Sequence, residues 1–202
     1  MSSEKIDLKK RRTLTYATTA VGAVGAAFLV GGPFVKSWMP NERAKNAGAP
    51  VEIDISKLDA GELLRVEWQG KPVWVLKRTD AMMKTVEEMP AANLVDADSH
   101  TASQQPDYAT NLFRSREDRA DILVLVGICT HLGCSPTYRP EIAPQDLGKE
   151  WKGGFYCPCH GSRFDLAGRV FKNLPAPTNL VVPEYYYKTD NLIVVGLSGG
   201  EA

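Results

Sequence analysis

The chain has 202 residues, enough for one or two compact domains. Apolar residues make up 44% and charged residues 24%, which excludes extended disorder and a collagen-like architecture for most of the chain. The 24 Lys and Arg residues balance the 24 Asp and Glu residues, and without a basic excess a nucleic acid is not expected as a partner.

The first 50 residues predict a membrane anchor followed by a tether. Residues 1–12 are basic, and residues 13–35 carry no charge. At 1.5 Å per helical residue this uncharged run covers the ~30 Å hydrocarbon core of a bilayer, so it predicts one transmembrane helix. Residues 36–50, rich in Pro, Gly, Asn and Ala, predict a flexible hinge. By the positive-inside rule, residues 1–12 stay in the cytoplasm and everything after the span lies across the membrane.

Export and processing leave two alternatives. The pair Arg11-Arg12 before the uncharged run resembles a twin-arginine export signal. A cleaved signal peptide would use a site such as Ala47-Gly48-Ala49, but its apolar stretch would be only about 7–15 residues long. That site also lies well beyond the apolar run, so a retained single-pass anchor is favoured.

Residues 51–202 predict one mostly antiparallel β domain. Alternating apolar residues from Val51 to Ile55 indicate a strand, and residues 62–68 and 72–78 indicate a hairpin around Gln69-Gly70. Thr79 or Asp80 is expected to cap a short helix. Residues 90–120 show no clear pattern. Further strands are expected at Ile122–Ile128, Leu180–Lys188 and Leu192–Gly196.

All four cysteines fall in two short motifs. The first reads Cys-Thr-His-Leu-Gly-Cys over residues 129–134, and the second reads Cys-Pro-Cys-His-Gly-Ser over residues 157–162. Together they also contain two of the three histidines. Thiolates and imidazoles at such short spacing are typical metal ligands. The remaining histidine, His100, is expected to lie on the surface.

Three kinds of site compete for these residues. A tetrahedral zinc site would use two cysteines and two histidines but explains neither the spare cysteine in each motif nor the glycines. A pure disulfide scaffold leaves the paired histidines unexplained. A Rieske [2Fe–2S] cluster, in which two histidines replace two cysteines on one iron, uses the whole set.

The two motifs resemble the cluster-binding boxes of Rieske proteins. The extra cysteine pair makes them similar to the Rieske subunits of ubiquinol–cytochrome c reductases, and so do residues 104–109 and 175–177. The resemblance implies a small antiparallel β-sandwich with one [2Fe–2S] cluster on its loops.

The resemblance also implies a role for each motif residue. Cys129 and Cys157 would bind the buried iron, and His131 and His160 the exposed iron. Cys134 and Cys159 would form a disulfide. Ser162 would donate to a cluster sulfur, Leu132 would shield the cluster, and residues 175–177 would form a third loop over it. Where the family often has a tyrosine, this chain has Phe164, so the hydroxyl that would bond a ligand sulfur is lost.

The function implied is electron transfer in a respiratory quinol:cytochrome c reductase. A histidine ligand, either His160 or His131, with His160 favoured, would meet the quinol and accept its proton while the cluster takes one electron. The partners would be cytochrome b and a c-type cytochrome. A Rieske subunit of a plastoquinol or arsenite enzyme, and a zinc-stabilised binding module without redox activity, are the alternatives.

Overall fold

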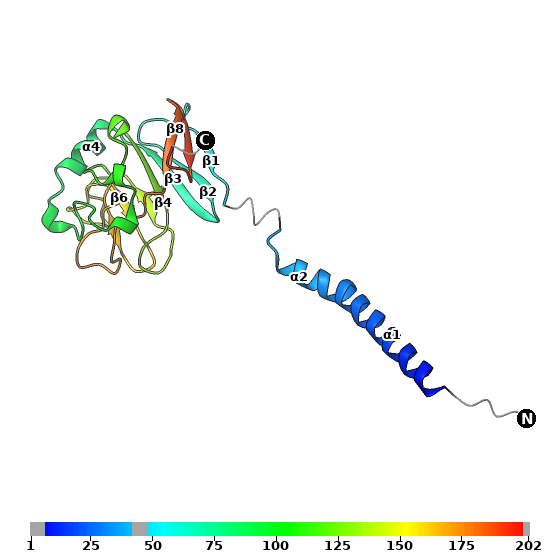
Figure 1. The fold of residues 1–202 in the computed structure, drawn as a ribbon. Helices are drawn as coiled ribbons and strands as arrows, with labels where there is room; N and C mark the ends of the chain where they lie inside the picture. The colour runs from blue at the N-terminus through cyan, green and yellow to red at the C-terminus, as the bar shows by residue number, and fades with distance from the viewer. Residues whose placement is uncertain (1–6, 42–47, 200–202) are drawn as a thin grey trace, which may run out of the picture. The chain divides into compact units, whose positions relative to one another are not determined.

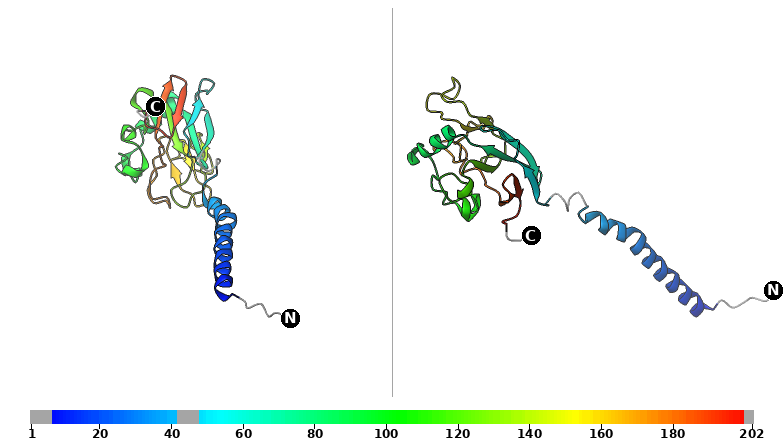
Figure 2. Two further views of the ribbon diagram at one scale, coloured as in Figure 1. Left: turned by 45° about the vertical axis from the view of Figure 1, so that its right-hand side comes forward. Right: turned by 90° about the horizontal axis from the view of Figure 1, so that it is seen from above.

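The computed structural model describes residues 7–41 and 48–199 of the chain (Figure 1). It divides into two compact units, Met1–Asn46 and Ala47–Ala202, which are described separately. Among the described residues of the first unit there is one long helix (Figure 2). It consists of three joined segments: α1 (Leu8–Ala26), the π-helical η1 (Ala27–Gly31) and α2 (Gly32–Trp38).

The π-helical segment lies just before Pro33, near the start of α2. Proline has no backbone N–H, and its ring clashes with the carbonyl four residues earlier, so a regular α-helix cannot continue through it undisturbed. A wider turn at η1 accommodates the ring without breaking the helix. The helix from Leu8 to Trp38 is 31 residues long and contains an 18-residue window with a mean hydropathy of 1.6, so it is long and apolar enough to cross a membrane.

The threonines of α1 explain how a moderately polar sequence suits this helix. Thr13, Thr15, Thr18 and Thr19 each donate their hydroxyl to a backbone carbonyl four residues earlier, at 2.8–3.1 Å. Their polar groups are therefore satisfied within the helix, as a lipid environment requires.

The helix extends beyond both ends of the predicted span of residues 13–35. It begins before the basic residues because Asp7 caps it, accepting hydrogen bonds from the backbone N–H groups of Lys9 and Lys10. It ends at Trp38, so the first three residues of the predicted hinge, 36–38, are helical. Residues 42–47 of that hinge lie outside the described residues.

Within residues 48–199, the second unit contains three antiparallel sheets of three strands each, which confirms the prediction of a mostly β domain. Their strand orders are β1-β9-β8, β2-β3-β4 and β5-β6-β7. The strands are β1 (Val51–Asp54), β2 (Leu63–Trp68), β3 (Lys71–Lys77), β4 (Ile122–Val126), β5 (Thr137–Arg139), β6 (Gly154–Tyr156), β7 (Arg163–Phe164), β8 (Tyr185–Thr189) and β9 (Leu192–Val195). Figure 1 shows β3 between β2 and β4.

The predicted hairpin is present as β2 and β3. Gln69 and Gly70 both have positive φ, 52° and 70°, as a two-residue turn of the type that matches strand twist requires. The next strand in this sheet, β4, is buried along its whole length. β3 and β4 each contribute a continuous run of buried residues to the hydrophobic core.

The segment between β3 and β4 contains one helix and several short turns. Thr79 caps α4 (Asp80–Glu87) as expected, because its hydroxyl accepts the backbone N–H of Met82. The unpatterned region of residues 90–120 consists largely of loops with short 3₁₀ segments: η2 (Ala91–Asn93), η3 (Ala102–Gln104), η4 (Asp107–Ala109) and η5 (Glu117–Arg119).

Two strand predictions need correction. The strand expected over Leu180–Lys188 begins only at Tyr185, because Pro183 has no N–H to donate to a sheet ladder. Leu180 and Val182 instead hydrogen bond to the carbonyls of Gly168 and Gln104. The sheet β5-β6-β7 was not predicted at all, and it carries the second cysteine motif.

Candidate metal centre

The two cysteine motifs form two loops, each positioned by a strand. Loop one (Cys129–Cys134) follows β4, and loop two (Cys157–Ser162) connects β6 to β7. The indole of Trp74 contacts a residue just before each loop. It stacks on Phe155 of β6 at a centroid distance of 5.2 Å, and it lies so close to Gly127, before loop one, that a Cβ there would be 2.1 Å from the ring. Only glycine fits at position 127, and this contact helps fix where both loops begin.

Both loops have the same backbone hydrogen bonds. In loop one, Cys129 N–H donates to the Cys134 carbonyl and Gly133 N–H donates to the Cys129 carbonyl. In loop two, Cys157 and Gly161 make the same two bonds, with Ser162 in the place of Cys134. The glycines have φ of 84° and 77°, a conformation that disfavours other residues. Each loop is therefore a closed turn with its first cysteine at the base.

The four side chains expected as ligands lie on these loops as two thiols and two imidazoles. Cys129 and Cys157 are free cysteines, and both are buried. The rings of His131 and His160 face each other edge to face, with centroids 4.7 Å apart. The Nδ1 atom of His131 is buried and has no hydrogen-bond partner within the described part of the chain. An inward-facing, unpartnered imidazole nitrogen suits a metal ligand.

The Cys129 thiol is surrounded by polar groups. It lies beside the Cys157 thiol, the backbone N–H of His131 and the Ser162 hydroxyl. Burial raises the pKa of this thiol above its ordinary value, because a buried thiolate without a counter-charge is costly. Ser162 is fully buried, so its hydroxyl is available to the sulfur atoms rather than to water.

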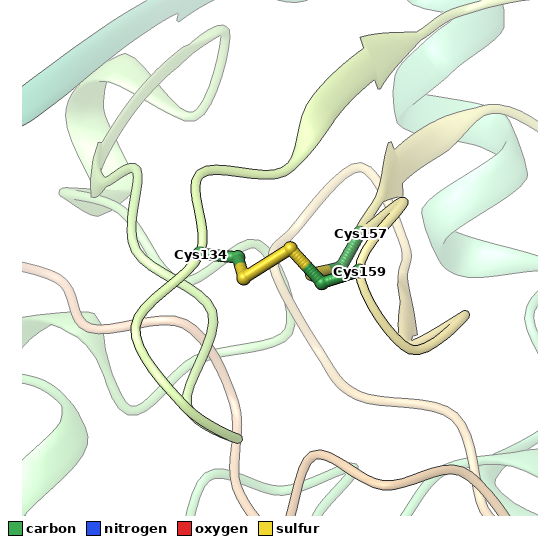
Figure 3. Close-up of side chains that lie close together, drawn as sticks. All are labelled: Cys134, Cys157 and Cys159. Carbon is green, nitrogen blue, oxygen red and sulfur yellow. A yellow bond between two sulfur atoms is a disulfide. The ribbon is translucent and has the colours of Figure 1, made fainter.

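A disulfide joins the two loops, from the closing residue of loop one to the middle of loop two. Cys134 and Cys159 are bonded, with their Cα atoms 6.7 Å apart, as the sequence predicts. The Sγ atom of Cys157 belongs to the same group, since the three sulfur atoms lie within 4.8 Å of one another (Figure 3). These three cysteines are not a ligand set, because the two bridged sulfurs have no thiolate to offer a metal.

A third loop braces both motif loops. The backbone N–H of Ala176 donates to the Ser162 hydroxyl at 3.1 Å, and the Thr130 hydroxyl donates to the Thr178 carbonyl at 2.7 Å. Residues 175–178 therefore contact loop one and loop two at once. The role of Thr130 was not predicted, and no periodicity or spacing in the sequence indicates it.

One end of the centre faces solvent. Leu132 is 71% exposed and His160 is also exposed, whereas His131 is half-buried. The two histidines are therefore not equivalent, and His160 is the more accessible to a second molecule. The third histidine, His100, is exposed outside both loops, as expected.

Buried arginines support the turn that follows loop two. Arg78 donates to the Leu166 carbonyl, and Arg114 donates to the carbonyls of Ala167 and Gly168. Burial lowers the pKa of each of these two arginines to about 10, so both remain charged at neutral pH. Arg169 pairs with Asp165 across the turn, and both side chains are 2% exposed. Charged residues are expected at the surface, so the sequence did not indicate these positions.

The residues of the centre fit an iron–sulfur cluster. Two buried thiols, one unpartnered imidazole nitrogen beside a second imidazole, and a buried hydroxyl supply the ligand types of a two-histidine, two-cysteine [2Fe–2S] site. The same four donors also match zinc in number, so the donor set by itself defines a metal centre on two braced loops.

Comparison with known proteins distinguishes these two possibilities. Residues 50–186 match the family described as "Rieske [2Fe-2S] domain", and residues 1–41 match "Ubiquitinol-cytochrome C reductase Fe-S subunit TAT signal". The fold and the site thus define a Rieske-type [2Fe–2S] protein with an apolar N-terminal helix. The predicted cofactor and the electron-transfer function are confirmed by this match.

Relatives of known function match nearly the whole chain. A "Ubiquinol-cytochrome c reductase iron-sulfur subunit" of Allochromatium vinosum is 56% identical over 100% of this chain and 95% of the relative. A protein of the same name in Blastochloris viridis is 40% identical over 96% of this chain and 97% of the relative. A solved chain from "Hyperthermophilic respiratory Complex III" is 25% identical over 87% of this chain and 98% of its own, with a TM-score of 0.46. The chain belongs to the family of ubiquinol–cytochrome c reductase iron–sulfur subunits.

Proposed function

We propose that this chain is the electron-transfer subunit of a respiratory quinol:cytochrome c reductase. It would take one electron and one proton from quinol and pass the electron to a c-type cytochrome. The observation that supports this is the exposed His160 beside a half-buried His131, on loops that also hold two buried thiols. When bound, a cluster with two neutral imidazole ligands supplies a one-electron acceptor of higher potential than an all-cysteine cluster.

The ligand assignment follows from burial. Cys129 and Cys157, both in the hydrophobic core, would bind the inner iron, and the two histidines at the solvent-facing end would bind the outer iron. Support for His131 comes from its buried Nδ1 atom, which has no other partner among the described residues. Ser162 would donate its hydroxyl toward sulfur while accepting the N–H of Ala176, so its orientation is fixed.

His160 and Leu132 would form the quinol contact. Nδ1 of His160 would bind the metal, as proposed for His131, so Nε2 of His160 would be the atom that accepts a hydrogen bond from the quinol hydroxyl and then its proton. Leu132, 71% exposed, would pack against the quinol and exclude water from that hydrogen bond. The second electron of the quinol would pass to a haem of cytochrome b.

The partners and the topology are inferred from the relatives and the first helix. A cytochrome b and a cytochrome c-type subunit lie at different places, so the β domain must move between them, and residues 36–50 would provide the hinge. The helix Leu8–Trp38 would be a single-pass anchor in a bacterial inner membrane, with residues 1–12 cytoplasmic and the β domain periplasmic.

Arg11 and Arg12 provide the test of this topology. Replacing both with lysine keeps the charge but removes the twin-arginine pair, so cluster-loaded protein should accumulate on the cytoplasmic side. Normal export of the double variant would disprove twin-arginine targeting. A mature protein that begins near Pro50 would disprove the retained anchor.

Spectroscopy of the purified chain tests the centre. The reduced protein should give a rhombic EPR spectrum with an average g value below that of the free electron. His131→Ala and His160→Ala should each lose this signal, whereas His100→Ala, the matched control outside both loops, should keep it. Zinc in place of iron, or a normal spectrum in either ligand variant, would contradict the assignment. Copurification with haem b and haem c tests the complex.

A further inference from the structure

Three of the four cysteine sulfur atoms lie in one group. Cys134 and Cys159 form the disulfide, and the free thiol of Cys157 lies with them, all three Sγ atoms within 4.8 Å of one another. Figure 3 shows Cys134 reaching across from loop one, while Cys157 and Cys159 both come from loop two. A free thiol beside a disulfide is the arrangement from which thiol–disulfide exchange starts.

We propose that Cys157 exchanges with the disulfide whenever it does not bind iron, so that loss of the cluster changes the pairing of the cysteines. The sulfur of Cys157 attacks Cys134. The bond between Cys134 and Cys159 breaks, a bond between Cys134 and Cys157 forms, and the thiol proton of Cys157 ends on Cys159. One disulfide is broken and one is made, so no oxidant or reductant is consumed.

Attack on Cys134 is favoured over attack on Cys159. A bond between Cys157 and Cys159 would close a tight ring through Pro158, whose φ is fixed by its own ring, and disulfides tolerate only a narrow geometry. A bond between Cys134 and Cys157 keeps the connection between loop one and loop two. The Sγ atoms of Cys134 and Cys157 already lie within 4.8 Å of each other.

The backbone of loop two keeps the Cys157 thiol in place for this reaction. Cys157 N–H donates to the Ser162 carbonyl, and the Cys157 carbonyl accepts from Gly161 N–H. The residue is also buried, at 1% exposure. The thiol therefore stays beside the disulfide rather than turning away into solvent.

The exchange would make cluster loss hard to reverse. This part of the inference rests on the ligand assignment proposed above, in which Cys157 binds the inner iron. After exchange that ligand is tied up in the bridge, and the free thiol is on Cys159, which is exposed rather than buried. Only three of the four ligand side chains would then remain available. A bound cluster holds Cys157 as a ligand, and it would thereby keep the disulfide between Cys134 and Cys159.

Disulfide mapping of the full-length chain in detergent tests the exchange. Iron is removed anaerobically with a chelator, the protein is denatured at acid pH to stop exchange, and free thiols are labelled with a maleimide and located by mass spectrometry. Without chelator the label should be on Cys129 and Cys157. After iron removal, label lost from Cys157 should equal label gained on Cys159. Label that stays on Cys157, or that disappears from Cys129 and Cys157 without a gain on Cys159, would overturn the proposal.

Two serine variants provide a matched pair. Cys129→Ser lacks one ligand but keeps the attacking thiol, so Cys159 should become labelled. Cys157→Ser lacks the attacking thiol, so its disulfide should stay between Cys134 and Cys159. Labelling of Cys159 in both variants would disprove attack by Cys157. A normal iron content and EPR spectrum in Cys157→Ser would instead disprove the ligand assignment, and the labelling pattern would still decide the exchange.

Discussion

Replacing Asp165 with asparagine should destabilise the β domain strongly, because it leaves the buried charge of Arg169 without its carboxylate counter-charge. The two side chains are 2.7 Å apart and each is 2% exposed. The other oxygen of Asp165 accepts the backbone N–H groups of Ala167 and Arg169, and an asparagine oxygen can keep these two bonds. The substitution therefore removes the charge and places the amide NH2 group, which cannot accept a hydrogen bond, against the Nε–H of Arg169. Breaking a buried ion pair from one side costs about 3–5 kcal/mol, which for a domain of this size lowers the melting temperature by on the order of 10 °C.

Thermal unfolding followed by near-ultraviolet circular dichroism measures this loss, since Trp74 and Trp151 are buried in the β domain. Glu88→Gln is the matched control: its pair with Lys84 is 3.8 Å long and largely exposed, so no measurable shift is expected. Adding Arg169→Met to the Asp165 variant should recover part of the loss, because both buried charges are then gone. A shift below about 3 °C in Asp165→Asn, or strict additivity in the double variant, would refute the reasoning.

Three further outcomes are expected. Phe164→Tyr should raise the cluster potential by on the order of tens of mV. The ring is buried in the same core as both ligand thiols, and a hydroxyl that donates to a ligand sulfur there favours the reduced cluster. A redox titration that shows no change or a fall would mean that the ring does not face a sulfur. Thr130→Val should shorten the cluster half-life, because it removes the 2.7 Å hydrogen bond to the Thr178 carbonyl. Thr110→Val should not, because the Thr110 hydroxyl bonds to the Asp107 carbonyl within its own turn. Equal half-lives of the two variants would count against the proposed role of Thr130. Burial raises the pKa of Tyr185 to about 12, whereas an unfolded tyrosine ionises near pH 10. The contribution of Tyr185 to stability is therefore complete below pH 10 and is lost as the pH rises to 12, by at most ~1.4 kcal/mol per pH unit. Melting temperatures should fall across this range, and Tyr185→Phe should reduce the slope.

The elements that could be predicted from the sequence are those with a strong local pattern. The hairpin of β2 and β3 combines apolar runs with a Gln-Gly turn, and both turn residues have the positive φ that this turn needs. The metal-binding motifs were equally clear, because four cysteines and two histidines within two six-residue segments are a dense set of soft ligands. In both cases the information lies within a few neighbouring residues.

The missing elements depend on contacts between distant residues. The strands of the β5-β6-β7 sheet are only two or three residues long, too short for an alternation to be visible. Leu180 and Val182 have the composition of a strand, but they bond to carbonyls of loops far away in the sequence. Arg114 is fully buried because loop carbonyls and the side chain of Gln105 surround its guanidinium. No local pattern indicates where such partners lie.

The matching hydrogen bonds of loop one and loop two have a consequence for protein design. Each six-residue turn sets the position of its first cysteine by two internal bonds and one left-handed glycine, so the turn itself is portable between scaffolds. The spacing between the turns is not portable. It depends on the contacts of Trp74 with Phe155 and Gly127, on the Cys134–Cys159 disulfide and on the third loop, residues 175–178. A transplanted centre therefore needs one β-hairpin for loop two, a separate strand that leads into loop one, and a rigid spacer between them. Grafting the twelve motif residues alone should produce two well-formed turns at the wrong separation.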